Sequence, residues 1–342
     1  MTDTQSCELD RARELMTWFR AHLERLHGLA RTHPHSEDIA TQTRQWVAEF
    51  HIADGKTGGY QLDQSMLVPC YVMPSAPTDV VGTLARYYTW LAAVNDELIY
   101  TDSSIDIFIE TVKKILHDGA PLDDDADRLI LAMASIRDSI LQLDASLILK
   151  FTDGVMGTLR AWRRRQQWVR SGDLPSLAEY LDYRAFCLAI DEASLLQRLQ
   201  PDLLEPHKPY TYGLARISKS AGLLTSLVND LISYPMEIRR GEEFTLFRVL
   251  AQEYGISHEQ TFPSALALVS AVHHELNALV SALRADANVN ATERHQADAL
   301  VAWVDGTYRW HLAGTRYDYA STSDVGTLQY PQARRDVQPS DH

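Results

Sequence analysis

Apolar residues recur at intervals of three and four positions through most of the chain, which is the pattern of helices that bury one face. Breakers rich in Gly, Pro and Asp separate these segments, as is typical of loops. The pattern predicts helices over residues 9–29, 39–50, 80–100, 105–117, 128–141, 145–170, 177–199, 212–238, 264–283 and 290–319. No long stretch alternates apolar and polar residues as a half-buried strand does. We therefore expect one all-α domain over residues 1–320, followed by a polar and mobile C-terminal tail over residues 321–342.

Composition narrows the class of protein further. A chain of 342 residues can bury a sizeable core without cross-links, and its three cysteines include no closely spaced pair that would indicate a disulfide framework or a zinc ribbon. The net charge of −14 argues against nucleic acid as a partner, because phosphate backbones need a basic surface. The first residues lack the basic start and apolar run of a signal peptide, and no stretch of eighteen residues is free of charge. These features predict a cytoplasmic protein with no membrane span.

The predicted helix at residues 212–238 carries a polar pattern suited to a hard cation. Asn229, Ser233 and Glu237 are spaced four residues apart, so all three line one face of a helix. An amide oxygen, a hydroxyl and a carboxylate are the ligands that Mg²⁺ prefers. The alternative is a polar stripe that faces solvent, and the largely apolar residues 223–228 just before it argue against that.

At this point the chain resembles the class I terpene synthases of microbial type. The second metal motif of that family reads N-D-x-x-S-x-x-x-E, and residues 229–237 read NDLISYPME, followed by the Gly-acid pair that family members usually carry. The family's C-terminal Arg-Tyr pair matches Arg316 and Tyr317, and its diphosphate-sensing arginine matches Arg184, which lies 45 residues before Asn229. Order and spacing together make the resemblance specific.

The resemblance implies a fold, a reaction and a set of roles. The fold would be a single terpenoid-synthase-like helical bundle around a deep apolar cavity. The reaction would be Mg²⁺-dependent ionisation of a prenyl diphosphate with three ions, followed by cyclisation to a terpene hydrocarbon or alcohol. Asn229, Ser233 and Glu237 would hold metal, and Arg184, Arg316 and Tyr317 would neutralise the leaving diphosphate. A homodimer is one option for the oligomeric state.

The family's first metal motif, D-D-x-x-D/E, is only partly present. Asp96 and Glu97 stand at the end of an apolar helix where the paired acids belong, while Asp102 comes too late for the third. Residues 123–127 read DDDAD and match the motif literally, but they follow a loop and directly precede a helix, where acids cap the N-terminus. We expect Asp96 and Glu97 to hold metal; the alternatives are the acids at 123–127 or no working first motif.

Other positions depart from the family. Met236 stands where members usually place a basic residue against the diphosphate, and Arg239 or Arg240 could substitute for it. Five arginines crowd residues 160–170, but they point all round a helix, so we expect a solvated or subunit-facing surface. Trp303, Trp310 and Tyr317 share one stripe of the last helix, where they either pack in the core or line the pocket and stabilise cations.

The length of the substrate depends on what lies beneath the diphosphate. Ala92 and Ala93 occupy positions one turn before Asp96 where family members often have an aromatic residue. A wider pocket would favour geranylgeranyl diphosphate or another C20 diphosphate over C15 farnesyl diphosphate, unless Phe186 or Trp310 fills the space. Two other functions remain open: a chain-elongating prenyltransferase, which would carry a second aspartate-rich motif instead of the triad, and a non-catalytic isoprenoid-binding protein.

Overall fold

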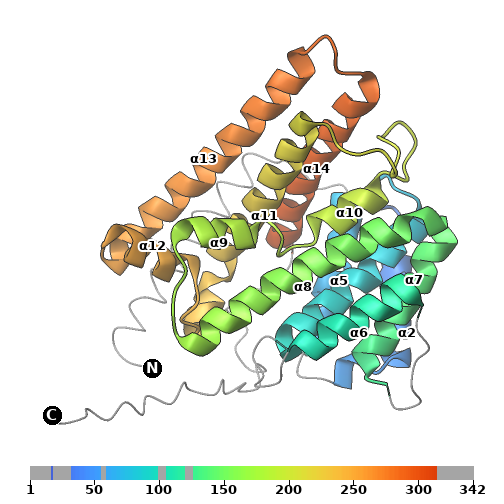
Figure 1. Ribbon diagram of the computed structural model, residues 1–342, viewed down its shortest axis with the longest axis horizontal. Coiled ribbons are helices and arrows are strands. Elements are labelled where there is room, and N and C mark those ends of the chain that lie inside the picture. Colours follow the sequence, from blue (N-terminus) through green and yellow to red (C-terminus); the bar gives the residue numbers. More distant parts are fainter. Residues whose placement is uncertain (1–16, 18–31, 55–58, 99–104, 120–125, 314–342) are drawn as a thin grey trace.

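The computed structural model describes residue 17 and residues 32–54, 59–98, 105–119 and 126–313 (Figure 1). Within these ranges every regular element is a helix, so the predicted all-α class is confirmed. The predicted helix at 9–29 and the predicted tail at 321–342 lie outside the described residues, apart from residue 17.

The helices follow the predicted order, with four differences. Three short helices were not predicted, namely α3, α4 and α12, because eight, five and nine residues give too little periodicity to detect. The predicted helix at 177–199 is broken into α9 and α10. The helices are α2 (Ser36–Glu49), α3 (Gly59–Met66), α4 (Val68–Val72), α5 (Thr78–Leu98), α6 (Ile105–Asp118), α7 (Arg128–Asp144), α8 (Ile148–Ser171), α9 (Leu177–Arg184), α10 (Ile190–Gln197), α11 (Tyr212–Arg240), α12 (Leu246–Tyr254), α13 (His258–Ala285) and α14 (Ala291–Ala313).

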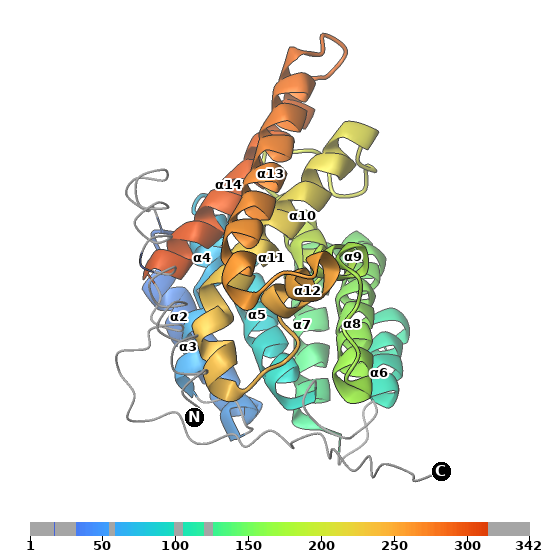
Figure 2. The same ribbon diagram turned by 90° about the vertical axis from the view of Figure 1, so that its left-hand side faces the viewer.

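Two groups of helices pack around a shared interior. Helices α5, α6, α7 and α8 lie side by side, and α11, α13 and α14 form the second group (Figures 1 and 2). Helix α4 joins α14 to the first group, because it packs against both α14 and α5. Its contact with α14 is so close that a side chain on Gly306 would meet the backbone carbonyl oxygen of Tyr71 at 2.5 Å.

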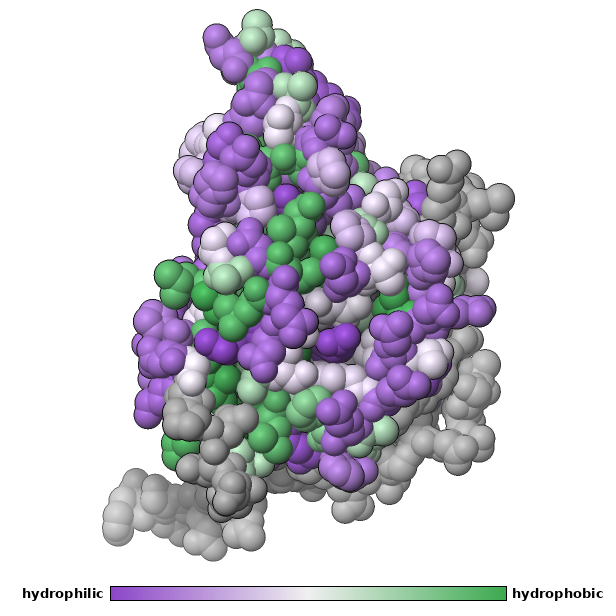
Figure 3. All heavy atoms as spheres, turned by 90° about the vertical axis from the view of Figure 1, so that its right-hand side faces the viewer, coloured by the Kyte–Doolittle hydropathy of each residue, from purple (hydrophilic) through white to green (hydrophobic). Residues whose placement is uncertain are grey.

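The outer surface follows the amphipathic pattern of the helices. On the face shown in Figure 3, hydrophilic residues cover most of the surface and hydrophobic ones gather in separate patches. Among the described residues one helix, α13, is long and apolar enough to cross a membrane by length and composition alone. This is weak evidence for a span, because α13 packs against α11, α12 and α14 within the bundle and buries Val269, Val272 and Leu276 there.

Two tyrosines of α5 hold the break between α9 and α10 in place. Ala189, the N-cap residue just before α10, has a positive φ of 53°. This left-handed conformation costs free energy for a residue with a side chain. The Tyr88 hydroxyl donates to the Leu188 carbonyl at 2.8 Å. The Tyr87 hydroxyl donates to the Glu192 carboxylate at 2.6 Å. These two bonds fix the strained turn against α5.

The fully buried Glu192 makes the stability of the protein depend on pH. Burial raises the pKa of its carboxyl from an ordinary 4.5 to about 7, although hydrogen bonds from Tyr87 and Thr158 oppose the shift. The pKa of Glu192 is higher in the folded than in the unfolded state. Its contribution to the free energy of unfolding is therefore complete below pH 4.5 and is lost as the pH rises through 7. A shift of this size corresponds to about 3 kcal/mol.

We therefore expect Glu192→Gln to flatten the pH dependence of unfolding. The amide oxygen of Gln can still accept both hydrogen bonds, but the side chain has no charge to desolvate at high pH. Urea unfolding at pH 4.5 and at pH 8 measures how much the free energy of unfolding falls between the two pH values. We expect this fall to be about 3 kcal/mol larger in the wild type than in the variant. Equal pH dependence in the two proteins would contradict the assignment.

Candidate active site

A cavity lies between α4, α5, α8, α9, α11 and α14. Aromatic and aliphatic side chains make up part of its wall, including Tyr88, Leu91, Trp303 and Trp310. The rest of the wall is polar and carries four carboxylates among the described residues: Asp96, Asp230, Glu237 and Glu242. A pocket that combines an apolar wall with clustered charges can hold a molecule with an apolar body and a charged head.

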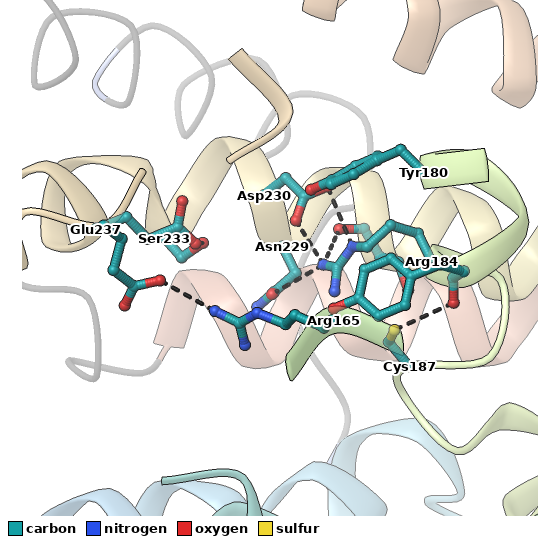
Figure 4. A network of polar contacts seen from close by, with 11 residues as sticks. Arg165, Tyr180, Arg184, Cys187, Asn229, Asp230, Ser233 and Glu237 are labelled. Carbon is teal, nitrogen blue, oxygen red and sulfur yellow. Dashed lines mark hydrogen bonds and ion pairs between the residues drawn. The ribbon is translucent and has the colours of Figure 1, made fainter. Parts of the chain in front are cut away.

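The three members of the predicted triad meet on the cavity wall. Asn229, Ser233 and Glu237 project from one face of α11, which continues as a single helix through Pro235 and ends at Gly241 with φ 71°. The Ser233 hydroxyl donates to the Glu237 carboxylate at 2.6 Å. The predicted spacing therefore brings an amide oxygen, a hydroxyl and a carboxylate to one side of the cavity (Figure 4).

Electrostatics at the triad favours a bound cation. Burial, followed by the neighbouring carboxylates of Glu242 and Asp230, raises the pKa of Glu237 to about 8, against the effects of Ser233 and Arg165. A divalent ion would relieve this repulsion by replacing the proton. Within the described part of the chain no cluster of three His, Cys, Asp or Glu side chains could hold a metal, so a site here would depend on the neutral oxygen ligands of Asn229 and Ser233. That donor set suits Mg²⁺.

The two acids of the first motif separate in the structure. Asp96 lines the cavity and is 9% exposed, and Asn95 donates to its carboxylate at 3.1 Å. Glu97 does not line the cavity and instead forms an ion pair with Arg128 of α7. The geometry thus favours Asp96 as the metal ligand of this helix and places Glu97 in a contact between α5 and α7.

The alternative acidic motif is only partly described. Asp127 is the N-cap of α7, and its carboxylate accepts the backbone N–H of Leu129 at 2.8 Å, which is the capping arrangement that the sequence indicated. Asp102, Asp123, Asp124 and Asp125 lie outside the described residues. Asp127 is not among the residues that line the cavity.

Arg184 ties α9 to the triad helix. Its guanidinium forms an ion pair with Asp230 at 2.6 Å and donates to the Ser226 carbonyl at 2.8 Å and to the Asn229 side-chain oxygen at 3.4 Å (Figure 4). Burial raises the pKa of Asp230, although Arg184 opposes this shift, and Tyr180 donates to the same carboxylate at 3.1 Å. Arg184 therefore lines the cavity and also orients the first residue of the triad.

The other predicted substrate contacts have mixed positions. Ala92 and Trp310 line the cavity, whereas Ala93 is fully buried behind the wall. Phe186, the other residue considered for filling the space beside the alanines, does not line the cavity and is 38% exposed. It lies between α9 and α10. The predicted contacts Arg316 and Tyr317, and the side chain of Arg240, lie outside the described residues.

Sequence reasoning missed Arg165 as a charged residue of the cavity. We expected the arginines of 160–170 to form a solvated or subunit-facing surface, and Arg160 and Arg170 are indeed exposed. Arg165 instead turns into the cavity, where its Nη2 donates to Glu242 at 3.1 Å. Arg165 shares a helix face with Trp162, three residues earlier, which lines the same cavity, but the sequence alone did not show that this face is the one turned inward.

Comparisons with known proteins match this chain to terpene synthases. The family profile for the C-terminal metal-binding domain of terpene synthase family 2 matches residues 87–275. The (+)-T-muurolol synthase of Roseiflexus castenholzii, whose name describes it as cyclising (2E,6E)-farnesyl diphosphate, is 23% identical over 83% of this chain and 90% of its own. The 2-methylisoborneol synthase of Streptomyces lasalocidi is 31% identical over 45% of this chain, a match that spans about a third (32%) of that relative's length.

Solved structures share the fold. The 2-methylisoborneol synthase of Streptomyces coelicolor A3(2), in complex with Mg²⁺ and geranyl-S-thiolodiphosphate, superposes with a TM-score of 0.70 at 19% identity over 89% of this chain and 96% of that one. The linalool/nerolidol synthase of Streptomyces clavuligerus gives 0.71 at 16% identity over 83% and 98%. At these identities the likeness is one of fold.

Proposed function

This chain belongs to terpene synthase family 2, and we propose that it is a Mg²⁺-dependent cyclase that ionises a prenyl diphosphate and closes the resulting carbocation to a terpene hydrocarbon or alcohol. One observation carries the proposal: a single cavity is lined by the triad of Asn229, Ser233 and Glu237, by Asp96 and by aromatic side chains. The assignment of these four residues as metal ligands, across two helices, is part of the proposal.

Each group of the cavity has a distinct task in this reaction. Mg²⁺, when bound, supplies the positive charge that stabilises the diphosphate as it leaves. Asp96 on α5 and the triad on α11 hold that charge from two sides, and Arg184 fixes Asn229 in position. By its place in the sequence motif, the Arg316 and Tyr317 pair would complete the diphosphate site. Fixed charges directed at a leaving group usually make the largest electrostatic contribution to catalysis.

The aromatic wall protects and guides the cation. Tyr88, Trp303 and Trp310 line the cavity with ring faces or edges, and indole and phenol rings attract carbocations as they attract other cations. Trp310 is held in place because its indole N–H donates to the Gln64 carbonyl at 2.8 Å. Tyr88, Trp303 and Trp310 are themselves buried, and a wall that excludes water from the cation would delay its capture. The released diphosphate would accept the final proton.

For the substrate we favour C15 farnesyl diphosphate. The relative that aligns over most of this chain cyclises farnesyl diphosphate by its name. Trp310, one of the two residues expected to fill the space that the alanines leave, lines the same cavity as Ala92. The specific observation in favour of a C20 substrate, such as geranylgeranyl diphosphate, is Ala92 itself, whose methyl group is the smallest side chain that still lines the wall.

Incubation of the protein with Mg²⁺ and C10, C15 or C20 diphosphates tests the proposal. We expect release of inorganic diphosphate and cyclic products by gas chromatography, with the highest kcat/KM for the C15 substrate. Linear products of greater chain length would instead identify a chain-elongating prenyltransferase. Binding of these diphosphates without turnover would identify a non-catalytic isoprenoid-binding protein.

Ala92→Phe should narrow the cavity next to Asp96. The added ring must either displace a neighbouring side chain or occupy substrate space, and overpacking of this kind costs about 1 to 3 kcal/mol. We expect kcat/KM for a C20 diphosphate to fall at least about 10-fold more than kcat/KM for the C15 diphosphate. Comparison of the two substrates on wild type and variant measures this, with circular dichroism as the check on folding. An unchanged ratio would show that Ala92 does not limit substrate length.

A further inference from the structure

Arg165 brings a second guanidinium to the metal triad from a helix that the family motifs do not include. It projects from α8 into the cavity with a side chain that is 13% exposed, and it points toward the Glu237 carboxylate (Figure 4). Its Nη2 donates to the Glu242 carboxylate at 3.1 Å, and its guanidinium carbon lies 5.9 Å from the centre of the Phe244 ring.

The two cavity arginines have partners of different kinds. Arg184 bonds to Asp230, to the Ser226 carbonyl and to Asn229, all on α11, and its loss would leave the carboxylate of Asp230 buried beside Tyr180 without its counter-charge. Breaking such a pair is costly. Arg165 bonds to Glu242, which follows the last residue of α11 and its Gly241 cap in the connection to α12. Glu242 therefore belongs to a loop, whereas Glu237, toward which the Arg165 guanidinium also points, belongs to the helix that carries the triad (Figure 4).

The charges of the cavity explain why Arg165 would change partners. The described wall carries four carboxylates and, of Lys and Arg side chains, only Arg165 and Arg184. While the triad holds no cation, Arg165 offsets the repulsion between Glu237 and Glu242. Cations at the triad would take over that task. A guanidinium freed in this way is well suited to a diphosphate, because its planar set of donors can bind two phosphate oxygens at once.

We propose that Arg165 binds the diphosphate group of the substrate, and that Glu242 holds its guanidinium beside the triad until substrate and Mg²⁺ arrive. This inference rests on the proposed function and adds to it a diphosphate ligand from α8. It also assigns a role to Glu242 as the residue that positions Arg165.

Titration calorimetry with inorganic diphosphate and excess Mg²⁺ tests the role of Arg165 without turnover. Arg165→Gln should weaken diphosphate binding about 10- to 100-fold, the usual effect of losing charge-assisted hydrogen bonds. Arg163→Gln is the matched control, because Arg163 lies on the same helix, is 44% exposed and pairs with Asp106 at 3.1 Å. It should bind within about 2-fold of the wild type.

Variants of Glu242 separate this role from a structural one. Under the proposal, Glu242→Gln releases Arg165 and leaves diphosphate binding as tight as in the wild type or tighter. If the pair only fastens α8 to the loop before α12, then Glu242→Gln and Arg165→Gln should weaken binding equally, and that result would overturn the proposal. If the Gln variant fails to fold, Arg165→Lys replaces it in this test. Lys keeps the positive charge but lacks the planar set of donors, so Arg165→Lys should bind diphosphate more weakly than the wild type.

The same measurements distinguish failure of this inference from failure of the proposed function. Arg165→Gln binding within 2-fold of a wild type that cyclises prenyl diphosphates would overturn the role of Arg165 alone. A wild type that binds inorganic diphosphate through Arg165 but releases none from C10, C15 or C20 substrates would support Arg165 and overturn the cyclase. A wild type that binds no inorganic diphosphate would overturn the role of Arg165.

Discussion

Asn229→Ala and Glu237→Ala are each expected to abolish turnover of prenyl diphosphates while the protein stays folded. Each substitution removes one of the three oxygen ligands that α11 supplies to the proposed metal site. Mg²⁺ binds weakly when its ligand set is incomplete. Glu237→Gln gives a milder version of the same test, because its amide oxygen can still accept the Ser233 hydroxyl but carries no charge. Steady-state turnover with saturating Mg²⁺ and the C15 diphosphate measures the effect.

Controls for the triad come from the same helical framework. Asn277 is an exposed asparagine on α13, so Asn277→Ala should leave kcat and KM unchanged. Thermal unfolding of each variant shows that a loss of turnover is not a loss of fold. Turnover near that of the wild type in a folded Asn229→Ala or Glu237→Ala protein would remove the triad from the proposed site.

The triad could be predicted from the sequence because its geometry is local. A spacing of four residues places Asn229, Ser233 and Glu237 on one face of any helix, and the apolar turn before them indicates that this face is buried. The cap of α7 is local for the same reason, since Asp127 needs only the backbone of Leu129 to act. Features of this kind depend on a few neighbouring residues and not on the rest of the fold.

The features that the sequence did not reveal depend on contacts between distant helices. The break before α10 has no glycine to mark it, and Ala189 keeps its positive φ because two tyrosines about 100 residues earlier hold the turn. Arg165 is one arginine among five in an eleven-residue segment, so periodicity alone could not show which of them faces the cavity. Its neighbours in space, Phe244 and Glu242, come nearly 80 residues later.

The separation of Asp96 and Glu97 has the same origin. Adjacent residues of a helix point about 100° apart, so Asp96 and Glu97 can face different neighbours. Asp96 faces the cavity, and Glu97 faces α7, where Arg128 offers an opposite charge. The sequence could not show this pairing, because Arg128 lies 31 residues away in the next helix but one.

Asp96→Ala is accordingly expected to lower turnover at least about 10²-fold, the usual effect of removing one major electrostatic contact from an active site. Asp96 is the carboxylate that α5 contributes to the wall of the cavity that the triad on α11 also lines. Glu97→Gln should have a much smaller effect on turnover, because Glu97 is engaged with Arg128 outside the cavity lining. Its main expected cost is in stability, since it leaves Arg128 without its partner.

The acids before α7 provide the decisive comparison for Asp96. Replacing Asp123, Asp124 and Asp127 together should cost about 1 kcal/mol of stability through the lost cap on Leu129, with little loss of turnover. Turnover and the dependence of rate on Mg²⁺ concentration are measured for this triple variant, Asp96→Ala and Glu97→Gln side by side. A triple variant that loses turnover while Asp96→Ala keeps it would transfer the first metal motif to the acids before α7.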